Sequence, residues 1–438
     1  MKIEQTNIEY SVEDLAMFEG YISKNRILIV EQSRPGGLRL RDIFISFGAK
    51  AKNIFLTDNF DIAKEYLLDK MPGIVISGYG FNKKFAFDLP YKRDRNRLFM
   101  IVSNDNKQNK IARSCENGID AYIIKPYTND DIKKIILSSA KQLTNPDLMQ
   151  KITNEGIIFF EQKKYEDAKK KFQQVLEKES DSPIASFYLG KIYQDEKNLI
   201  EAEKCYRMGL VASSVHYKSL SSMYQLLLDN KQIVSSFDML KRLIEYFPEN
   251  STRFNSALRL SIVTENYDFI HDLFEKYQTL EIQTDEMKKY VAAALVIMGT
   301  NYLTQNKITR AVEAFGHAAQ ISLNNVLILR KIIEVLTDYN MAKEIQEYFN
   351  NFTEDDKFGP DYRVCEFFVS CFFDSKENSI QKGEYIIKSM KVINSQIYKL
   401  MYQKYMAVHD QQGLDWIKGL IVKDFPEKFR FKKVDALS

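Results

Sequence analysis

A spacing of 34 residues recurs through the middle of this 438-residue chain and restricts the folds that it can adopt. The same kinds of residue return one period later: Gly156 and Gly190, Ala168 and Ala202, Phe172 and Tyr206. Small residues allow two helices to approach closely, and aromatic residues fill the space where helices interlock. With only 9 Pro and 17 Gly, many helices joined by short turns are expected. The period therefore predicts stacked pairs of helices.

The period and these positions resemble a tetratricopeptide repeat array. The expected units are 149–182, 183–216, 217–250, a weaker 251–285, 292–325 after a slip of seven residues, and a degraded 326–351. Further helices are expected at 360–373, 380–392, 396–409 and 414–422, as divergent repeats and a C-terminal cap. The stretch 290–306 is not expected to span a membrane, because Gly299 and several polar residues interrupt its apolar residues. The repeat phase assigns it to the first helix of the unit 292–325.

Stacked helix pairs of this kind are expected to present an inner groove, lined by the first helix of each pair, that can receive a peptide or a helix. The repeat phase assigns these groove positions: Thr153, Ile157, Phe160, Phe187, Lys191, Gln194, Ser221, Gln225 and Leu228. For the apolar members, simple packing between helices is an equally good interpretation. One variety of the family clamps a free carboxylate with Lys, Asn and Arg at set positions. Thr153 and Ile157 occupy two of those positions, so this clamp is absent from the first repeat. The expected ligand is therefore an internal helix or an extended segment.

The first third of the chain follows a different pattern, in which short apolar runs alternate with amphipathic stretches. The runs are 26–31, 53–57, 73–77, 98–103 and 121–125, and the helical stretches are 37–47, 59–70, 106–117 and 129–143. Continuous apolar runs are typical of strands that are covered on both faces. Five strands alternating with helices predict a doubly wound α/β domain with a parallel sheet, followed by the all-α array.

Ligand sites in such sheets lie beyond the carboxyl ends of the strands. The residues expected there are Glu31-Gln32, Gly78, Ser103 and Lys125-Pro126, and they make the segment resemble a response-regulator receiver domain. That family carries an acidic pair after its first strand, a phosphoacceptor Asp ending the third, and a Ser or Thr ending the fourth. It also has an aromatic switch residue in the fifth strand, matched here by Tyr122, and a closing Lys-Pro.

Two departures from the receiver pattern predict that phosphorylation is lost. Gly78 stands where the acceptor aspartate is expected, and Gln32 replaces half of the acidic pair, so only Glu31 remains of three carboxylates. Without them the chain lacks a nucleophile and ligands for Mg²⁺. Ser77 is out of phase along the strand and is not expected to substitute. Lys125, freed from a phosphate, can pair with Glu31; alternatively Ser103, Tyr122 and Lys125 are relics with structural roles only.

Charge and the absence of motifs exclude several classes of function. Lys and Arg number 62 against 59 Asp and Glu, so no excess charge indicates nucleic acid or an anionic membrane. The four His are scattered, no phosphate-binding loop or nucleophile elbow occurs, and the four Cys are expected to be reduced thiols. No secretory signal is expected at the N-terminus. These features predict a cytoplasmic protein that is not an enzyme and needs no cofactor or metal.

Three surface features have expected roles. Residues 1–25 predict an amphipathic helix with a start signal at Ser11 and Asp14, which covers the same chain or, alternatively, docks a partner. The face that receivers use for dimerisation would include Arg113, Glu116, Asp120, Tyr122 and Lys133, which allows a homodimer. The segment 83–97 interleaves basic and aromatic residues, a pattern that can bind nucleic acid but is more typical of a solvated surface.

The expected domains are a helix at 1–25, a degenerate receiver at 26–145, repeats at 146–351, and divergent repeats with a cap at 352–438. The leading hypothesis is an adaptor of two-component signalling that binds a protein partner without membrane or nucleic acid. A second hypothesis is a receiver that still switches, through a ligand or through phosphorylation at Ser77 or Ser103. A third is an RNA-binding scaffold that uses the segment 83–97.

Overall fold

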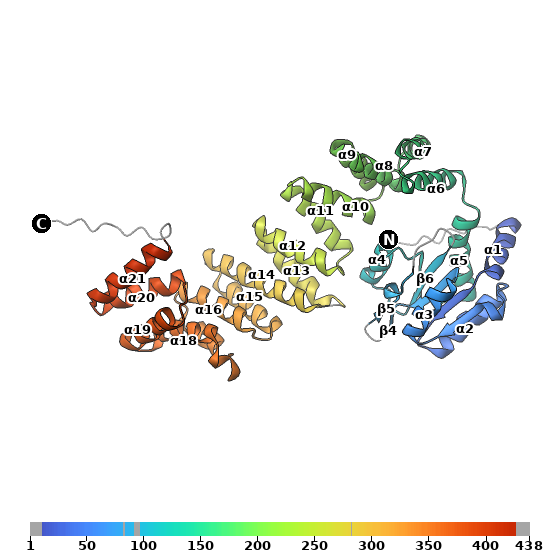
Figure 1. Cartoon of the computed structure of the whole chain (residues 1–438). Coiled ribbons are helices and arrows are strands. Elements are labelled where there is room, and N and C mark those ends of the chain that lie inside the picture. Colours follow the sequence, from blue (N-terminus) through green and yellow to red (C-terminus); the bar gives the residue numbers. More distant parts are fainter. Residues whose placement is uncertain (1–10, 82–83, 92–96, 282, 426–438) are drawn as a thin grey trace. The chain divides into compact units, whose positions relative to one another are not determined.

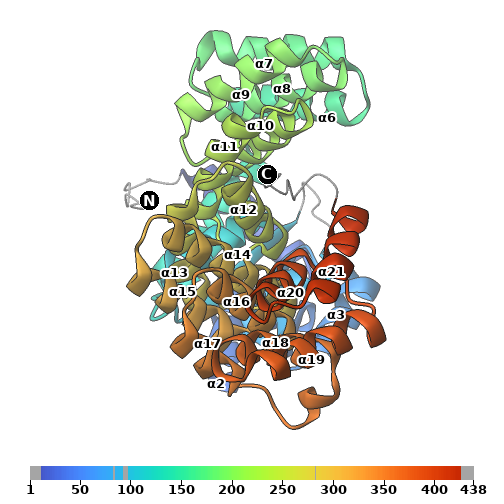
Figure 2. The same cartoon turned by 90° about the vertical axis from the view of Figure 1, so that its left-hand side faces the viewer.

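The computed structural model describes residues 11–81, 84–91, 97–281 and 283–425 (Figures 1 and 2). These residues divide into two compact units, the first ending at Asn250 and the second beginning at Ser251. The first unit contains a parallel sheet followed by helical hairpins, and the second is helical throughout its described part. Within the described ranges, no helix combines the length and the apolar character that crossing a membrane requires.

A five-stranded parallel sheet forms the N-terminal part of the first unit, as predicted. Its strands are β1 (Ile27–Val30), β2 (Ile54–Thr57), β3 (Ile74–Gly78), β6 (Leu98–Ser103) and β7 (Ala121–Ile124), in the order β2-β1-β3-β6-β7. The register pairs Ile27 with both Ile54 and Ile74, and Ser77 with Ile101. This order, with the first strand between the second and the third, is one of the two common doubly wound topologies.

Each face of the sheet packs against a separate apolar core. The first core joins the sheet to α1 (Val12–Lys24), α2 (Arg34–Ser46) and α5 (Asn129–Thr144). The second joins it to α3 (Phe60–Lys70) and to the segment 79–91. Because both faces are covered, the strands read as continuous apolar runs in the sequence.

Helix α1 covers the sheet of its own chain, which confirms the first of the two roles considered for it. The predicted start signal is a capping box, in which Ser11 and Asp14 exchange two hydrogen bonds of 3.1 Å. Phe18 and Ile22 are buried in the first core. Lys141 Nζ of α5 donates to Asp14 Oδ2 at 2.9 Å, and this bond lowers the pKa of the Asp14 carboxyl.

The connection between β3 and β6, for which the sequence predicts no helical stretch, contains no α-helix in its described residues. They form two short antiparallel strands, β4 (Gly80–Phe81) and β5 (Lys84–Phe85), and the 3-10 turn η2 (Ala86–Asp88). Aromatic side chains take the place of a helix over this face of the sheet. The rings of Phe85 and Phe87 stack with their centres 5.3 Å apart. The guanidinium of Arg113 on α4 (Gln108–Glu116) lies 4.4 and 4.3 Å from these two ring centres. Cation–aromatic contacts of this kind hold the segment against α4.

Three helical hairpins complete the first unit and repeat with the predicted period. They are α6 (Leu148–Glu161) with α7 (Tyr165–Lys178), α8 (Pro183–Asp195) with α9 (Leu199–Ala212), and α10 (Tyr217–Asp229) with α11 (Ile233–Tyr246). The turns are also alike, since Lys163, Lys197 and Lys231 all have φ near +60°. The next N–H reaches back to a carbonyl near the end of the first helix, as from Lys164 to Phe159 at 2.8 Å. This left-handed ending satisfies the helix carbonyls.

The second unit continues the hairpins and explains the slip of seven residues. The unit predicted to be weak, α12 (Ser251–Val263) with α13 (Tyr267–Thr279), is a regular hairpin. The next first helix, α14 (Asp285–Thr304), has 20 residues where α12 has 13, and α15 (Ile308–Ile321) follows it. Seven residues make about two helical turns, so the extra length extends the helix without rotating its packed face.

Beyond α15 the hairpins become irregular but keep their spacing. The elements are α16 (Val326–Asp338), α17 (Ala342–Phe349), α18 (Pro360–Phe373), α19 (Lys376–Glu384) continuing into a π-helical turn (Tyr385–Ser389), α20 (Ser395–Ala407) and α21 (Gln411–Asp424). The second helices begin at residues 308, 342, 376 and 411, close to the 34-residue period. His409 again has φ of 57°, and the N–H of Asp410 bonds the Tyr405 carbonyl. These helices therefore keep the spacing of the repeats, and their interpretation as divergent repeats with a C-terminal cap stays a prediction.

Close approach within a hairpin can be tested with two Gly→Ala substitutions in the second unit. A Cβ at Gly299 of α14 would lie 2.5 Å from the Phe315 ring, whereas one at Gly419 of α21 would meet nothing within 4 Å. We expect Gly299→Ala to lower the free energy of unfolding by about 1–3 kcal/mol through overpacking. Gly419→Ala should raise it by up to about 1 kcal/mol through helix propensity. Urea unfolding followed by circular dichroism measures both, and equal effects would contradict this packing.

Candidate functional site

The carboxyl edge of the sheet is closed by an ion pair between its first and last strands. Lys125 Nζ, after β7, donates to Glu31 Oε2, after β1, at 2.8 Å, the pairing considered from the sequence. The Glu31 side chain is 7% exposed and that of Lys125 is 23% exposed. The second Glu31 oxygen accepts from the Ser33 N–H at 3.2 Å. Both carboxylate oxygens therefore have partners within the domain.

At the tip of β3, an aromatic ring lies against the position where a side chain would begin. A Cβ built on Gly78 would be 3.3 Å from the Phe81 ring and 3.8 Å from the Val30 carbonyl. Phe81 itself is buried in the second core. The neighbouring Ser77 is fully buried, and its hydroxyl donates to the Gly78 carbonyl at 3.0 Å. A phosphodonor can reach Ser77 only if β3 is opened.

Ser103 and Tyr122 are joined through one backbone segment after β6. The Asp105 N–H donates to Ser103 Oγ at 3.0 Å, and the Tyr122 hydroxyl donates to the Asp105 carbonyl at 2.9 Å. The Asp105 carboxylate accepts from the Lys107 N–H and pairs with Lys110, and these contacts lower its pKa. Ser103 is buried. Ser103 and Tyr122 thus hold the same turn.

The remaining residues predicted for this edge lie apart from these contacts. Gln32 is exposed. Phe81 and Asp105 were not predicted from the sequence. Their proximity to Gly78, Ser103 and Tyr122 depends on the fold of the β3–β6 connection, for which no local signal is present. Among the described residues, no group of three His, Cys, Asp or Glu side chains could hold a metal ion.

Part of the expected dimerisation face is engaged inside the domain. Arg113 packs on Phe85 and Phe87, and Asp120 Oδ2 accepts the Phe99 N–H at 2.8 Å. Of the basic segment 83–97, Lys83, Lys92, Arg93 and Arg95 lie outside the described residues. Lys84 Nζ pairs with Asp61 at 2.6 Å.

The predicted groove residues of the first repeats lie along consecutive first helices. The ring centres of Phe160 on α6 and Tyr188 on α8 are 5.3 Å apart. Lys218 Nζ of α10 lies 5.7 Å from the ring centre of Phe187, which is also on α8. These contacts bring α6, α8 and α10 together on one face, which we call the first-helix face.

The nine predicted residues contribute unequally to this face. Thr153 is buried, and its hydroxyl donates to the Met149 carbonyl at 2.8 Å, so it only packs within the array. Gln194 accepts from the Tyr206 hydroxyl at 2.7 Å, which ties it to α9. Gln225 is exposed and donates to Asp229. The other six are half-buried: Ile157, Phe160, Phe187, Lys191, Ser221 and Leu228.

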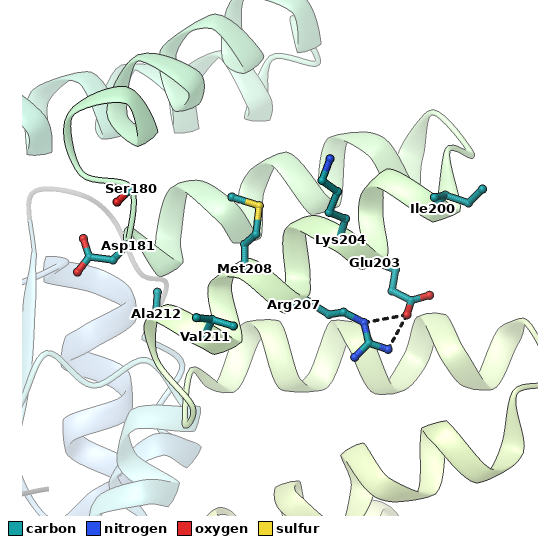
Figure 3. Close-up of a pocket in the computed structure, with 9 residues that line it drawn as sticks. All are labelled: Ser180, Asp181, Ile200, Glu203, Lys204, Arg207, Met208, Val211 and Ala212. Carbon is teal, nitrogen blue, oxygen red and sulfur yellow. Dashed lines mark hydrogen bonds and ion pairs between the residues drawn. The ribbon is translucent and has the colours of Figure 1, made fainter.

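A pocket outside the predicted groove lies along the outer side of α9 (Figure 3). Its volume is about 820 Å³, and it is open to solvent. Its lining comes from α9 and from the loop before α8: Ser180, Asp181, Ile200, Glu203, Lys204, Arg207, Met208, Val211 and Ala212. A signal in the sequence could have identified this pocket: α9 has apolar residues at positions where α7, one period earlier, has polar residues.

The Glu31–Lys125 pair predicts an asymmetry between two lysine substitutions. Lys125→Met leaves the buried Glu31 carboxylate without its cation, and we expect unfolding to be easier by about 2 kcal/mol. Lys84→Met removes a pair whose side chains are 47% and 70% exposed, so a change below about 0.5 kcal/mol is expected. Denaturant titration of the two variants compares them. A similar cost for both would show that burial does not strengthen the pair at the sheet edge.

His216, at the start of α10, predicts a loss of stability in mild acid. Burial of its ring, helped by the charge of Lys218, lowers its pKa from 6.5 to about 4. The unfolded chain therefore binds a proton at higher pH than the folded chain. The contribution of neutral His216 is complete above pH 6.5 and declines as the pH falls toward 4.

With allowance for partial exposure of the ring, we expect about 1 kcal/mol to be lost between pH 7 and pH 5. His216→Gln should remove this part of the pH dependence in urea unfolding curves. Parallel pH profiles for the variant and the native protein would rule out this role.

Comparison with known proteins yields only distant likeness. No family model and no curated protein matches the sequence. Among solved structures, Naa15/Naa10 bound to HypK-THB matches 68% of this chain at 14% identity with a TM-score of 0.37; the chain spans about half (50%) of that structure's length. PilF of Pseudomonas aeruginosa matches 62% of this chain and 97% of its own at 13% identity and a TM-score of 0.21. A tetratricopeptide repeat protein of Parabacteroides merdae matches 58% of this chain and 98% of its own at 15% identity and a TM-score of 0.28.

Proposed function

We propose that this protein is a cytoplasmic signalling adaptor, in which a phosphorylation-incompetent receiver-like domain is joined to a tetratricopeptide array that binds another protein. The observation that carries the first part is the tip of β3. Gly78 has no side chain there, and the buried Phe81 ring lies 3.3 Å from where a Cβ would stand. An acyl phosphate needs a carboxylate at this point and room for Mg²⁺ beside it.

The contacts around this tip support a domain with one resting conformation. Lys125, which in receivers faces the phosphate, is bound by Glu31. Ser103 and Tyr122 both bind the backbone of Asp105. Phosphorylation at Ser77 or Ser103 is disfavoured, because both hydroxyls are buried and hydrogen-bonded. The domain then contributes surface and not a switch.

The binding role of the array rests on its first-helix face. Half-buried apolar and aromatic side chains lie on the same first helices as Lys191, whose Nζ donates to the neutral Gln194 side chain at 3.5 Å. Hairpin stacks commonly use such a face to receive a peptide or a helix.

A phosphodonor tests the first part of the proposal. The full-length protein is incubated with acetyl phosphate, or with beryllofluoride and Mg²⁺, and examined by intact mass and thermal shift. We expect no added phosphoryl mass and no stabilisation by beryllofluoride, because the carboxyl edge of the sheet lacks both an acceptor aspartate and a set of carboxylates to bind Mg²⁺. A Mg²⁺-dependent gain of either kind would establish a working receiver and contradict the adaptor.

A double variant with changed charges on the first-helix face tests the second part. Partners retained from lysate by the full-length protein are compared with those of Lys191→Glu/Gln225→Lys, which changes two solvent-accessible residues of the face. Lys170→Glu, on the exposed side of α7, is the matched control. We expect loss of the same partners in the double variant only. Equal recovery from all three proteins would place partner binding elsewhere.

A further inference from the structure

Helix α9 carries two apolar stripes where a helix at the surface of the array needs one. The inner stripe is buried against neighbouring helices and includes Ala202, Tyr206 and Leu210. The outer stripe faces solvent, with Ile200 81% exposed, Val211 88% exposed and Met208 40% exposed. Isolated apolar residues are common on surfaces, but an aligned group beside a pocket marks an interaction site.

The repeat itself shows that its packing does not require the outer stripe. One period earlier, α7 places Glu166, Gln174 and Glu177 at the positions of Ile200, Met208 and Val211, and all three are exposed. One period later, α11 has Val234, Arg242 and Glu245 there. Among these three second helices, only α9 is apolar at all three positions, although their inner faces pack alike. The outer stripe therefore has a cause other than the fold.

Two cations lie between the apolar ends of the stripe. The side chains of Lys204 and Arg207 are 66% and 59% exposed. Arg207 donates to a single oxygen of Glu203, and Lys204 Nζ is 3.5 Å from Glu201. Figure 3 shows both residues between Ile200 and Val211, with Ser180 and Asp181 on the adjacent loop. Along the helix, the open surface thus runs from Ile200 through these two exposed cations to Met208 and Val211, with the carboxylates of Glu203 and Asp181 also in its lining.

We propose that this outer face of α9 docks an amphipathic helix of another protein, whose apolar stripe is interrupted by acidic residues. The stripe from Ile200 to Val211 is about 16 Å long, or about three helical turns, which suits a helix laid along it. Carboxylates of the partner meet Lys204 and Arg207. A second copy of α9 does not fit, because antiparallel pairing brings Lys204 of one chain opposite Arg207 of the other, and like charges repel.

Synthetic helical peptides test this docking with the full-length protein. The first peptide has two leucines spaced as Ile200 and Val211 are, with two glutamates between them; matched peptides carry glutamine or lysine in place of the glutamates. Fluorescence anisotropy measures their dissociation constants. We expect the glutamate peptide to bind best, in the micromolar range for so short a contact, and the lysine peptide worst. Absence of binding by the glutamate peptide, or no preference among the three, overturns the proposal.

Variants that copy the surface of α7 locate the site without disturbing the fold. Ile200→Glu/Met208→Gln/Val211→Glu places on α9 the residues that α7 carries at the same repeat positions. We expect it to raise the dissociation constant of the glutamate peptide at least about tenfold, since the contacts of the two leucines with Ile200 and Val211 are lost. Val234→Glu, an exposed apolar residue on α11, is the control and should change nothing. Unchanged binding by the triple variant overturns the site.

Charge reversal tests the chemistry of the partner separately. Lys204→Glu/Arg207→Glu should invert the order, so that the lysine peptide binds best; an unchanged order overturns the acidic partner. Sedimentation equilibrium provides the other discriminating result. Self-association of the native protein that the triple variant abolishes would assign the face to a second copy and overturn the proposal.

Discussion

Three hairpins of the helical part share one contact, in which an aromatic ring of the second helix lies against a residue without a side chain on the first. A Cβ at Gly156, Gly190 or Gly299 would lie within 3 Å of Phe172, Tyr206 or Phe315. The left-handed residue in the turn returns the chain at the angle that this contact needs. Together they fix the hairpin, and they use only its inner side. Outward positions are consequently free to differ from repeat to repeat, as they do between α7 and α9.

The N-terminal sheet depends on a different constraint, the filling of the space beyond its central strand. In a doubly wound sheet a helix normally covers the face between β3 and β6. Here aromatic side chains of the segment 79–91 do so, and Phe81 reaches the tip of β3. The same packing that completes the core therefore also places an aromatic ring against Gly78 at the end of β3.

Much of the fold was predictable because its signals are local or periodic. Strands such as Leu98–Ser103 are apolar runs, and helix pairs repeat every 34 residues, so short windows of sequence reveal both. The weak unit 251–285 is regular in the structure because hairpin geometry tolerates the loss of its small residues. The sequence does not reveal the regular starts of α19 and α21, since the residues at their repeat positions have changed while the helix spacing has not.

The sequence by itself determined which residues stand at fixed points, namely Glu31, Gly78 and Lys125, and a period of 34 residues that is typical of helical hairpins. Only the tertiary structure decided what surrounds those points. The Phe81 ring at the tip of β3, the shared turn that joins Ser103 to Tyr122, and the solvent-facing stripe on α9 all arise from contacts between elements. Such contacts depend on how distant segments fill space around one another, and the order of neighbouring residues contains no measure of that.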